Sequence, residues 1–151
     1  MSDAAAAPRV DFYVLESADA RTRLNYACRL VEKAYLAGQT LYIALDDDAA
    51  VEALDEYLWT YSERSFVPHE RLGAGDAPVL LGVGVPAPAP ARVLVNLAAE
   101  PPARFADFER VAEFVDADPA RRDQGRRRFA FYRDHGIRAQ THNVGGDAAR
   151  G

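Results

Sequence analysis

Five short apolar runs, separated by helical or turn-rich stretches, set the strongest limit on how this chain can fold. They occupy residues 10–15, 40–45, 79–85, 92–97 and 111–116. Runs of this length between turn signals are typical of buried β-strands. The fifth run could also continue a short helix that begins in "PARFADFER". The sequence therefore predicts a sheet of about five strands.

The segments between these runs indicate how the strands are connected. Leu24, Cys28, Val31 and Tyr35 recur at helical spacing between the first two runs, and Gly38 can cap that helix. Ser17 or Asp19 can cap its start. A second helix follows residue 45, and a third is expected from Pro119 to His135, because proline is tolerated in a first turn.

A strand–helix–strand–helix order predicts parallel strands joined by right-handed crossovers. The expected fold is a single three-layer α/β/α domain with a mainly parallel central sheet of about five strands. We expect residues 1–9 to be flexible, residues 10–144 to form the domain, and residues 145–151 to be a disordered tail. No strand is predicted in the closing segment from Thr141, which is expected to be frayed.

Length and composition fit one globular domain in the cytoplasm. The chain has 151 residues, of which 49% are apolar and 27% charged. Its one cysteine, Cys28, excludes an intrachain disulfide and suits a reducing compartment. The first residues lack the pattern of a signal peptide, and no apolar run approaches the roughly 18–20 residues that span a bilayer.

Charge is distributed unevenly along this acidic chain, whose net charge is −5. Residues 118–138 carry seven arginines and three aspartates, a local balance of +4, whereas the rest carries −9. An acidic body repels a nucleic-acid backbone over much of its surface. The basic segment is therefore better suited to a short anionic ligand or peptide than to a long nucleic acid.

Motifs for enzymatic chemistry are weak, so neither an enzyme nor a bound cofactor is expected. The glycine-rich "GAGDAP" and "GVGVP" precede no helix and lack the Lys-Ser/Thr of a phosphate-binding loop. Asp46–Asp48 could hold a metal after a strand end, but capping and first-turn positions of a helix are favoured.

The three histidines and the cysteine also predict no metal site. His69 is expected in a loop, and His135 in the last turn of the closing helix, where a cation is favourable. Neither they nor His142 have metal-ligand spacing with one another or with Cys28. Cys28 lies on the apolar face of the first helix and is expected to be inert core.

The closing helix carries the most informative pattern. Four of its residues recur at i, i+4, i+7 and i+11 and form one stripe along the helix: Arg122, Arg126, Phe129 and Arg133. Guanidinium groups beside an aromatic ring suit a ligand with both a carboxylate and an aromatic side chain. The alternative is a solvated basic face, with Phe129, Phe131 and Tyr132 turned partly into the core.

A second cluster of aromatic residues follows the second helix. "LWTYSERSFVPH" brings together Trp59, Tyr61 and Phe66 at a helix end and in the following loop. Large aromatic residues are enriched both in cores and at interface hot spots. The pattern alone leaves core packing and a partner surface equally open.

These segments together resemble the chi subunit family of bacterial DNA polymerase III. The resemblance rests on "VDFYVL", on "LDEYLWTYSERSFVPH" followed by a glycine-rich loop, on "FADFERVAEFVD", and on a closing helix that contains "YRDHG". It covers residues 10–144 in order. It implies a non-catalytic accessory protein of the clamp loader. Such a protein pairs one-to-one with the psi subunit or with an accessory helicase, and it grips the acidic C-terminal tail of single-stranded DNA-binding protein.

The resemblance also assigns residues to the two surfaces. The tail site falls on Val115, Arg122, Arg126 and Phe129, with Arg127 or Arg133 as a replacement for a basic side chain expected at Ala130. The surface for psi or the helicase falls on Trp59 and Phe66. Two other functions remain open from the residues alone: direct binding of single-stranded nucleic acid by the basic helix, and a metal enzyme built on Asp46–Asp48.

Overall fold

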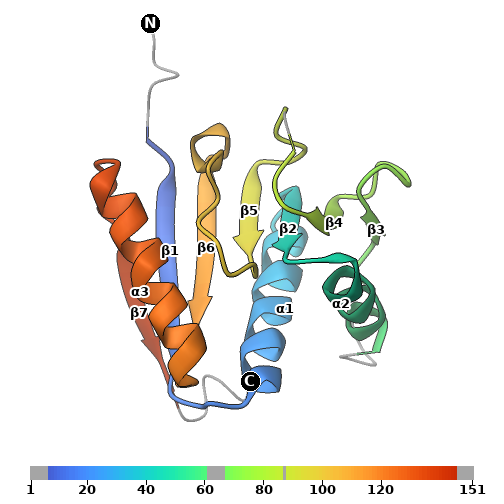
Figure 1. Cartoon of the computed structure of the whole chain (residues 1–151). Coiled ribbons are helices and arrows are strands. Elements are labelled where there is room, and N and C mark those ends of the chain that lie inside the picture. Colours follow the sequence, from blue (N-terminus) through green and yellow to red (C-terminus); the bar gives the residue numbers. More distant parts are fainter. Residues whose placement is uncertain (1–6, 61–66, 87, 146–151) are drawn as a thin grey trace, which may run out of the picture.

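The computed structural model describes residues 7–60, 67–86 and 88–145, and these form a three-layer α/β/α domain around a parallel sheet (Figure 1). The strands are β1 (Arg9–Leu15), β2 (Leu41–Leu45), β3 (His69–Arg71), β4 (Val79–Val83), β5 (Val93–Asn96), β6 (Arg110–Val115) and β7 (Gln140–Val144). The helices are α1 (Ala20–Leu36), α2 (Asp48–Thr60) and α3 (Pro119–Asp134), with a short 3₁₀ helix, η2 (Phe105–Asp107).

The strands form one sheet in the order β3-β4-β2-β5-β6-β1-β7, and every neighbouring pair is parallel. The predicted fold class is confirmed, but the sheet has seven strands rather than about five. The fifth apolar run forms β6, which pairs with β1, and does not continue a helix.

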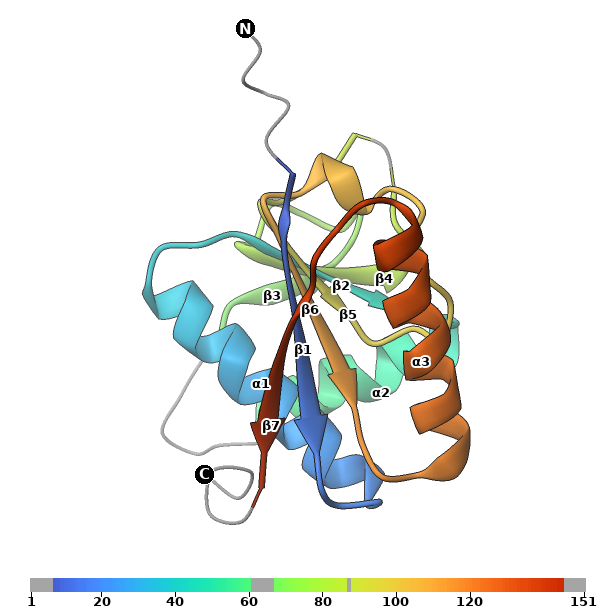
Figure 2. The same ribbon diagram turned by 90° about the vertical axis from the view of Figure 1, so that its left-hand side faces the viewer.

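Helices cover both faces of the sheet, as Figure 2 shows: α1 lies on one side and α3 on the other. Side chains of β1 divide accordingly, since successive residues of a strand point to opposite faces. Tyr13 and Leu15 pack with Cys28 and Val31 of α1. Val10 and Phe12 of β1 pack with Tyr132 of α3 and with Phe105 and Phe108. The burial of Cys28, which raises the pKa of its thiol to about 12, confirms the expectation that it is core.

The two strands absent from the prediction lie at the edges of the sheet. β3 contains His69, which was expected in a loop but is buried, with its Nδ1 2.7 Å from the Val67 carbonyl and its Nε2 3.1 Å from Asp55 Oδ1. β7 occupies the segment expected to be frayed. His142 in β7 lies with its Nε2 2.8 Å from buried Asp11 Oδ1 and stacks on Tyr13. Both strands are mostly polar, and β3 has only three residues, so they lack the apolar run that marks the inner strands.

Two of the acidic residues after β2 accept hydrogen bonds from backbone amides. Asp47 Oδ1 accepts a hydrogen bond from the Ala50 amide at 2.8 Å, as a residue before a helix does. Asp46 Oδ1 accepts one from the Ala99 amide at 2.8 Å and so ties β2 to the chain beyond β5. The predicted helix-capping role is confirmed for Asp47. In the part of the chain that the structure describes, no group of three or more His, Cys, Asp or Glu side chains is placed to hold a metal ion.

Candidate partner-binding surface on helix α3

Helix α3 starts and stops where the sequence predicts, within one residue. Asp118 caps its start by accepting a hydrogen bond from the Arg121 amide at 3.0 Å, and Pro119 occupies its first position. The helix ends before Gly136, whose φ of 80° lies in the left-handed region that glycine adopts without strain. These two ends fix the extent of the helix, and its buried residues, Gly125, Arg128 and Tyr132, define the face that is turned toward the sheet.

The inner face of α3 is fastened to the sheet by a buried charged network. Arg128 Nε donates to Glu113 Oε1 at 2.7 Å, while the Tyr132 hydroxyl and Asn96 Nδ2 donate to Glu113 Oε2 at 2.6 and 2.9 Å. Arg128 also donates to the carbonyl oxygens of Ala99 and Phe114. Arg128 and Glu113 are almost fully buried. Because every charged atom of this pair is hydrogen-bonded, the network satisfies the condition under which buried charges are tolerated.

Burial and the neighbouring carboxylate affect the hydroxyl in this network. They raise the pKa of Tyr132 far above its usual value, first through desolvation and then through Glu113. The hydroxyl therefore stays protonated and donates a hydrogen bond to Glu113. This hydrogen bond fixes the inner face of α3 against Glu113 of β6.

A second arginine of the basic segment is also structural. Arg121 faces buried Asp116 at the end of β6, with its NH2 2.9 Å from Oδ2, and its NH2 also donates to the Ala18 carbonyl at 3.2 Å. The hydrogen bond to Asp116 raises the pKa of Arg121, which keeps the guanidinium charged. Two of the seven arginines in the basic segment therefore serve folding, and composition alone could not separate them from the others.

The four residues of the predicted stripe lie together on the exposed flank of α3. Arg122, Arg126 and Arg133 are exposed, and Phe129 is 38% exposed. The Phe129 ring meets Phe12 of β1 edge to face, with 5.2 Å between ring centroids, so this flank faces the β1 and β7 side of the sheet. The stripe is thus neither fully solvated nor fully core.

The charges of this flank differ in how they are compensated. Among the described residues, ion pairs join Arg127 to Asp123 and Arg133 to Asp134, but none joins Arg122 or Arg126 to a carboxylate. Arg122 and Arg126 therefore present guanidinium groups whose donors are available to a partner. Arg127 projects on the other side of the helix from Phe129, whereas Arg133 lies beside it.

A hollow of about 310 Å³ opens next to Phe129. Phe129 and Arg133 line it from α3, and Ile137 and Ala139 line it from the turn that leads to β7. Its walls combine an aromatic ring, aliphatic carbon and two cationic groups, those of Arg133 and Arg138. This hollow could accept a single apolar side chain with a carboxylate close by.

Val115 occupies a different position from the other residues predicted for the site. It is 7% exposed and lies under Gly125, where a Cβ would come within 2.6 Å of Val115 Cγ2. Glycine at this position thus lets α3 approach β6 closely. Val115 supports the helix from below, and its side chain is mostly covered.

The second predicted surface is described only in part. Trp59, at the end of α2, is 51% exposed, and its ring centroid lies 4.4 Å from that of buried His69. Phe66 lies outside the described residues. The indole of Trp59 is therefore held against β3 and also presents about half of its surface to solvent.

The sequence interpretation missed Glu113 and Arg128, although a signal was present. Glu113 interrupts a strand whose other residues, such as Val111 and Phe114, are apolar, and a carboxylate in such a strand requires a partner. Gly125, Arg128 and Tyr132 follow at helical spacing on the inner face of α3. The two patterns together would have placed Arg128 opposite Glu113.

The fold and this surface define a parallel α/β domain with a cationic, partly aromatic flank on helix α3. The family model described as "DNA polymerase III chi subunit, HolC" matches residues 8–140, so the chain belongs to this family of DNA polymerase III subunits. Chi subunits are accessory, non-catalytic subunits of a replicative polymerase.

Three relatives support this assignment, and each is called DNA polymerase III subunit chi. The protein of Pseudomonas aeruginosa is 42% identical over 137 residues, which cover 90% of this chain and 96% of the relative. That of Haemophilus influenzae is 29% identical, covering 92% and 99%. That of Escherichia coli is 30% identical, covering 76% and 80%. In the described part of the chain, no helix is long and apolar enough to cross a membrane.

Proposed function

We propose that this protein links the clamp-loader complex of DNA polymerase III to single-stranded DNA-binding protein by gripping the acidic C-terminal tail of that protein. The observation that carries the proposal is the pairing of two uncompensated guanidinium groups, those of Arg122 and Arg126, with a hollow beside Phe129. The tail chemistry implied by the family resemblance is a set of aspartates followed by an apolar Pro-Phe with a free carboxylate.

The proposed complex assigns each group a part. Arg122 and Arg126 pair with the carboxylates, because guanidinium forks match carboxylate geometry. The last Phe of the tail enters the hollow and contacts Phe129, and Arg133 approaches its terminal carboxylate. Val115 keeps α3 in place under this site. Since the ion pairs are exposed, the affinity is expected to fall as salt concentration rises.

Isothermal titration tests this function directly. The whole protein is titrated with a peptide ending in Asp-Ile-Pro-Phe and, separately, with the same peptide lacking the final Phe. Binding of the first peptide alone is expected. Equal binding of both would contradict the hollow as the Phe pocket, and failure of both would contradict the tail-binding function.

The nucleic-acid alternative is tested with the same preparation. Fluorescence anisotropy with a short single-stranded oligonucleotide at low salt is expected to show weak binding, because the body of the protein is acidic. Tight binding that is lost in Arg126→Ala would instead assign the helix flank to nucleic acid.

We further propose that the surface around Trp59 pairs with the psi subunit in a one-to-one complex, or with an accessory helicase. A half-exposed indole held against β3 suits an interface anchor, since tryptophan is enriched at hot spots. Coexpression with a psi subunit followed by gel filtration tests this. Trp59→Ala is expected to weaken the complex and Arg126→Ala to leave it intact, whereas an unchanged complex with Trp59→Ala would contradict the assignment.

A further inference from the structure

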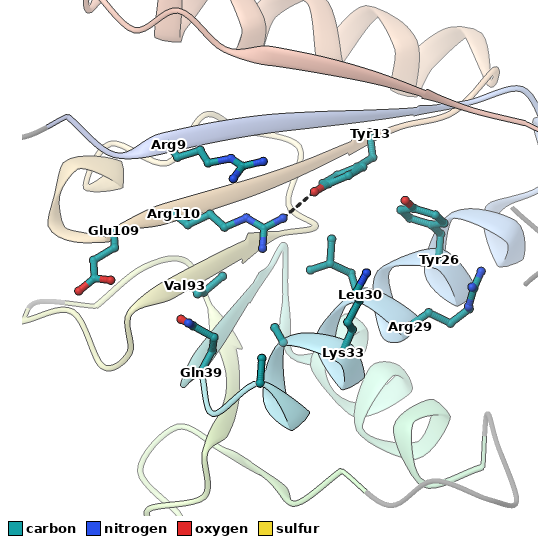
Figure 3. Close-up of a pocket in the computed structure, with 12 residues that line it drawn as sticks. Arg9, Tyr13, Tyr26, Arg29, Leu30, Lys33, Gln39, Val93, Glu109 and Arg110 are labelled. Atoms are coloured by element: carbon teal, nitrogen blue, oxygen red, sulfur yellow. Dashed lines mark hydrogen bonds between the residues drawn. The ribbon is translucent and has the colours of Figure 1, made fainter. Parts of the chain in front are cut away.

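A separate pocket of about 600 Å³ lies on the opposite face of the sheet from α3 (Figure 3). It is bounded by α1 on one side and by the amino-terminal parts of β1, β5 and β6 on the other. Its volume falls within the range of small-molecule sites. Neither proposed partner surface includes any of its lining residues.

The floor of the pocket is apolar and aromatic. Leu30 of α1 and Val93 of β5 line it together with the rings of Tyr13 and Tyr26, whose centroids are 5.6 Å apart. Figure 3 shows these side chains directed into the space between helix and strands. Such a floor suits a flat ring, which would bury its faces against carbon.

One wall of the pocket holds two arginines in fixed positions. Buried Asp11 pairs with Arg9 (Nε to Oδ2, 2.9 Å) and with Arg110 (Nε to Oδ2, 3.3 Å). Arg110 NH2 also donates to the Tyr13 hydroxyl at 2.6 Å, shown as a dashed line in Figure 3. One carboxylate faces two guanidinium groups, so this wall keeps a positive excess that is already oriented.

The opposite wall adds the only lysine of the chain. Lys33 lines the pocket from α1, is exposed, and is joined by no ion pair to any carboxylate within the described ranges. The one acidic lining residue, Glu109, is compensated outside the pocket by Arg92 at 3.1 Å. A cation on each wall above an apolar floor favours an anionic ligand that also carries a ring.

We propose that this pocket binds a small aromatic anion of mononucleotide size. The ring lies over the floor formed by Tyr26 and Leu30, and the phosphate lies between Lys33 and the Arg9–Arg110 wall. Gln39, which also lines the pocket, supplies an amide that can both donate to and accept from a ring edge. The bounded volume favours a single small molecule over an extended peptide.

The single lysine gives this proposal a direct readout. The whole protein is treated with an amine-acetylating reagent, and acetylation of Lys33 is followed by mass spectrometry with 2′-deoxyadenosine 5′-monophosphate, deoxyadenosine or inorganic phosphate present. The monophosphate is expected to slow acetylation of Lys33 at least several-fold. Deoxyadenosine and inorganic phosphate are expected to have little effect, since each supplies only half of the recognised chemistry.

Titration calorimetry with matched variants locates the binding. Lys33→Met, on an exposed helix position, and Arg9→Met are expected to weaken monophosphate binding about tenfold each, as loss of one charge-assisted contact does. Arg126→Ala on α3 is the matched control and is expected to leave this binding unchanged. The same variant is expected to weaken binding of the acidic tail peptide, so the pocket proposal and the tail-site proposal are tested independently.

Three results with the monophosphate or with inorganic phosphate would overturn the proposal. They are absence of monophosphate binding at millimolar concentration, equal protection of Lys33 by inorganic phosphate, and monophosphate binding that depends on Arg126 and not on Lys33. Protection of Lys33 by the acidic tail peptide would also overturn it and would assign the pocket to a peptide.

Discussion

The two sides of helix α3 use arginine in opposite ways. On the inner face, Arg128 is buried, and its guanidinium contacts Glu113 and two carbonyl oxygens. On the outer flank, Arg122 and Arg126 are exposed, and no carboxylate among the described residues pairs with them. Arginine therefore holds the helix in place on its inner face, whereas Arg122 and Arg126 of the outer flank have guanidinium groups that are free to pair with a partner. Burial and compensation, not residue type, separate the structural arginines from those proposed to bind.

The largest expected effect comes from a substitution that removes the buried ion pair on the inner face of α3. Arg128→Met leaves the Glu113 carboxylate buried without its cation, which is expected to lower the free energy of unfolding by about 3–5 kcal/mol. Urea denaturation measures it. Arg127→Met, whose exposed parent pairs with Asp123, is the matched control and is expected to cost less than about 0.5 kcal/mol. Adding Glu113→Gln to Arg128→Met should recover part of the loss, and no recovery would contradict the charge explanation.

The next largest effect is expected on the outer flank, where a substitution should weaken binding of the peptide but leave the stability of the protein almost unchanged. Arg126→Ala is expected to weaken binding of the acidic tail peptide by about 1–3 kcal/mol, in the range of hot-spot residues. Its free energy of unfolding should change by no more than about 0.5 kcal/mol, because the side chain is exposed. Calorimetry and urea denaturation on the same sample give both values. A loss of stability as large as the loss of binding would mean that the two sides of α3 are not distinct.

Alkaline pH is expected to act on the inner face through Tyr132. The folded protein raises the pKa of this hydroxyl. The stabilisation that the protonated hydroxyl gives the folded state is therefore complete below about pH 10, the pKa of tyrosine in the unfolded chain, and is lost as the pH rises above that value. For each such hydroxyl, the free energy of unfolding falls by about 1.4 kcal/mol per pH unit in this range. Tyr42, with its pKa raised to about 12 by burial, adds its own slope up to that pH. Tyr132→Phe should make the decline shallower, and an identical slope in wild type and variant would contradict this role.

The smallest effect concerns the fit between α3 and β6. Gly125→Ala places a Cβ against Val115, and overpacking of this kind costs about 1–3 kcal/mol, while alanine in a helix recovers roughly 0.5–1 kcal/mol. A net loss of about 1 kcal/mol is expected in urea denaturation. In a Val115→Ala background the same substitution should become neutral or stabilising. A loss that persists there would show that Val115 does not limit the approach of the helix.

The inner strands of the sheet could be predicted because their residues are apolar on both faces. β1, β2, β4, β5 and β6 follow from the apolar runs within one or two residues. The edge strands β3 and β7 could not, because they are mostly polar and their pairing depends on partners elsewhere in the chain. β7 is held by contacts such as His142 with Asp11, which are 131 positions apart and leave no local pattern.

The stripe on α3 could be predicted from helical spacing, since Arg122, Arg126, Phe129 and Arg133 share one flank. The sequence could not predict which arginines of the helix are structural and which are exposed without a carboxylate partner among the described residues. That distinction depends on the placement of Glu113 and Asp116 beneath the helix, and these acidic residues belong to β6 and to its carboxyl end. The pocket over Tyr13 and Leu30 was also not predicted, because its walls come from four separate elements.

The pairing of β1 has a consequence for how the protein is made. β1 is the first of the described strands to be synthesised, yet both of its neighbours follow about a hundred or more residues later, with Arg9 opposite Arg110 and Asp11 opposite Gln140. No local hairpin can protect it in the meantime, since parallel neighbours require long connections. Such distant pairing slows folding and leaves an apolar strand exposed during synthesis. A nascent chain that stops before β6 would carry this apolar strand unpaired, and unpaired strand edges of this kind are prone to aggregate.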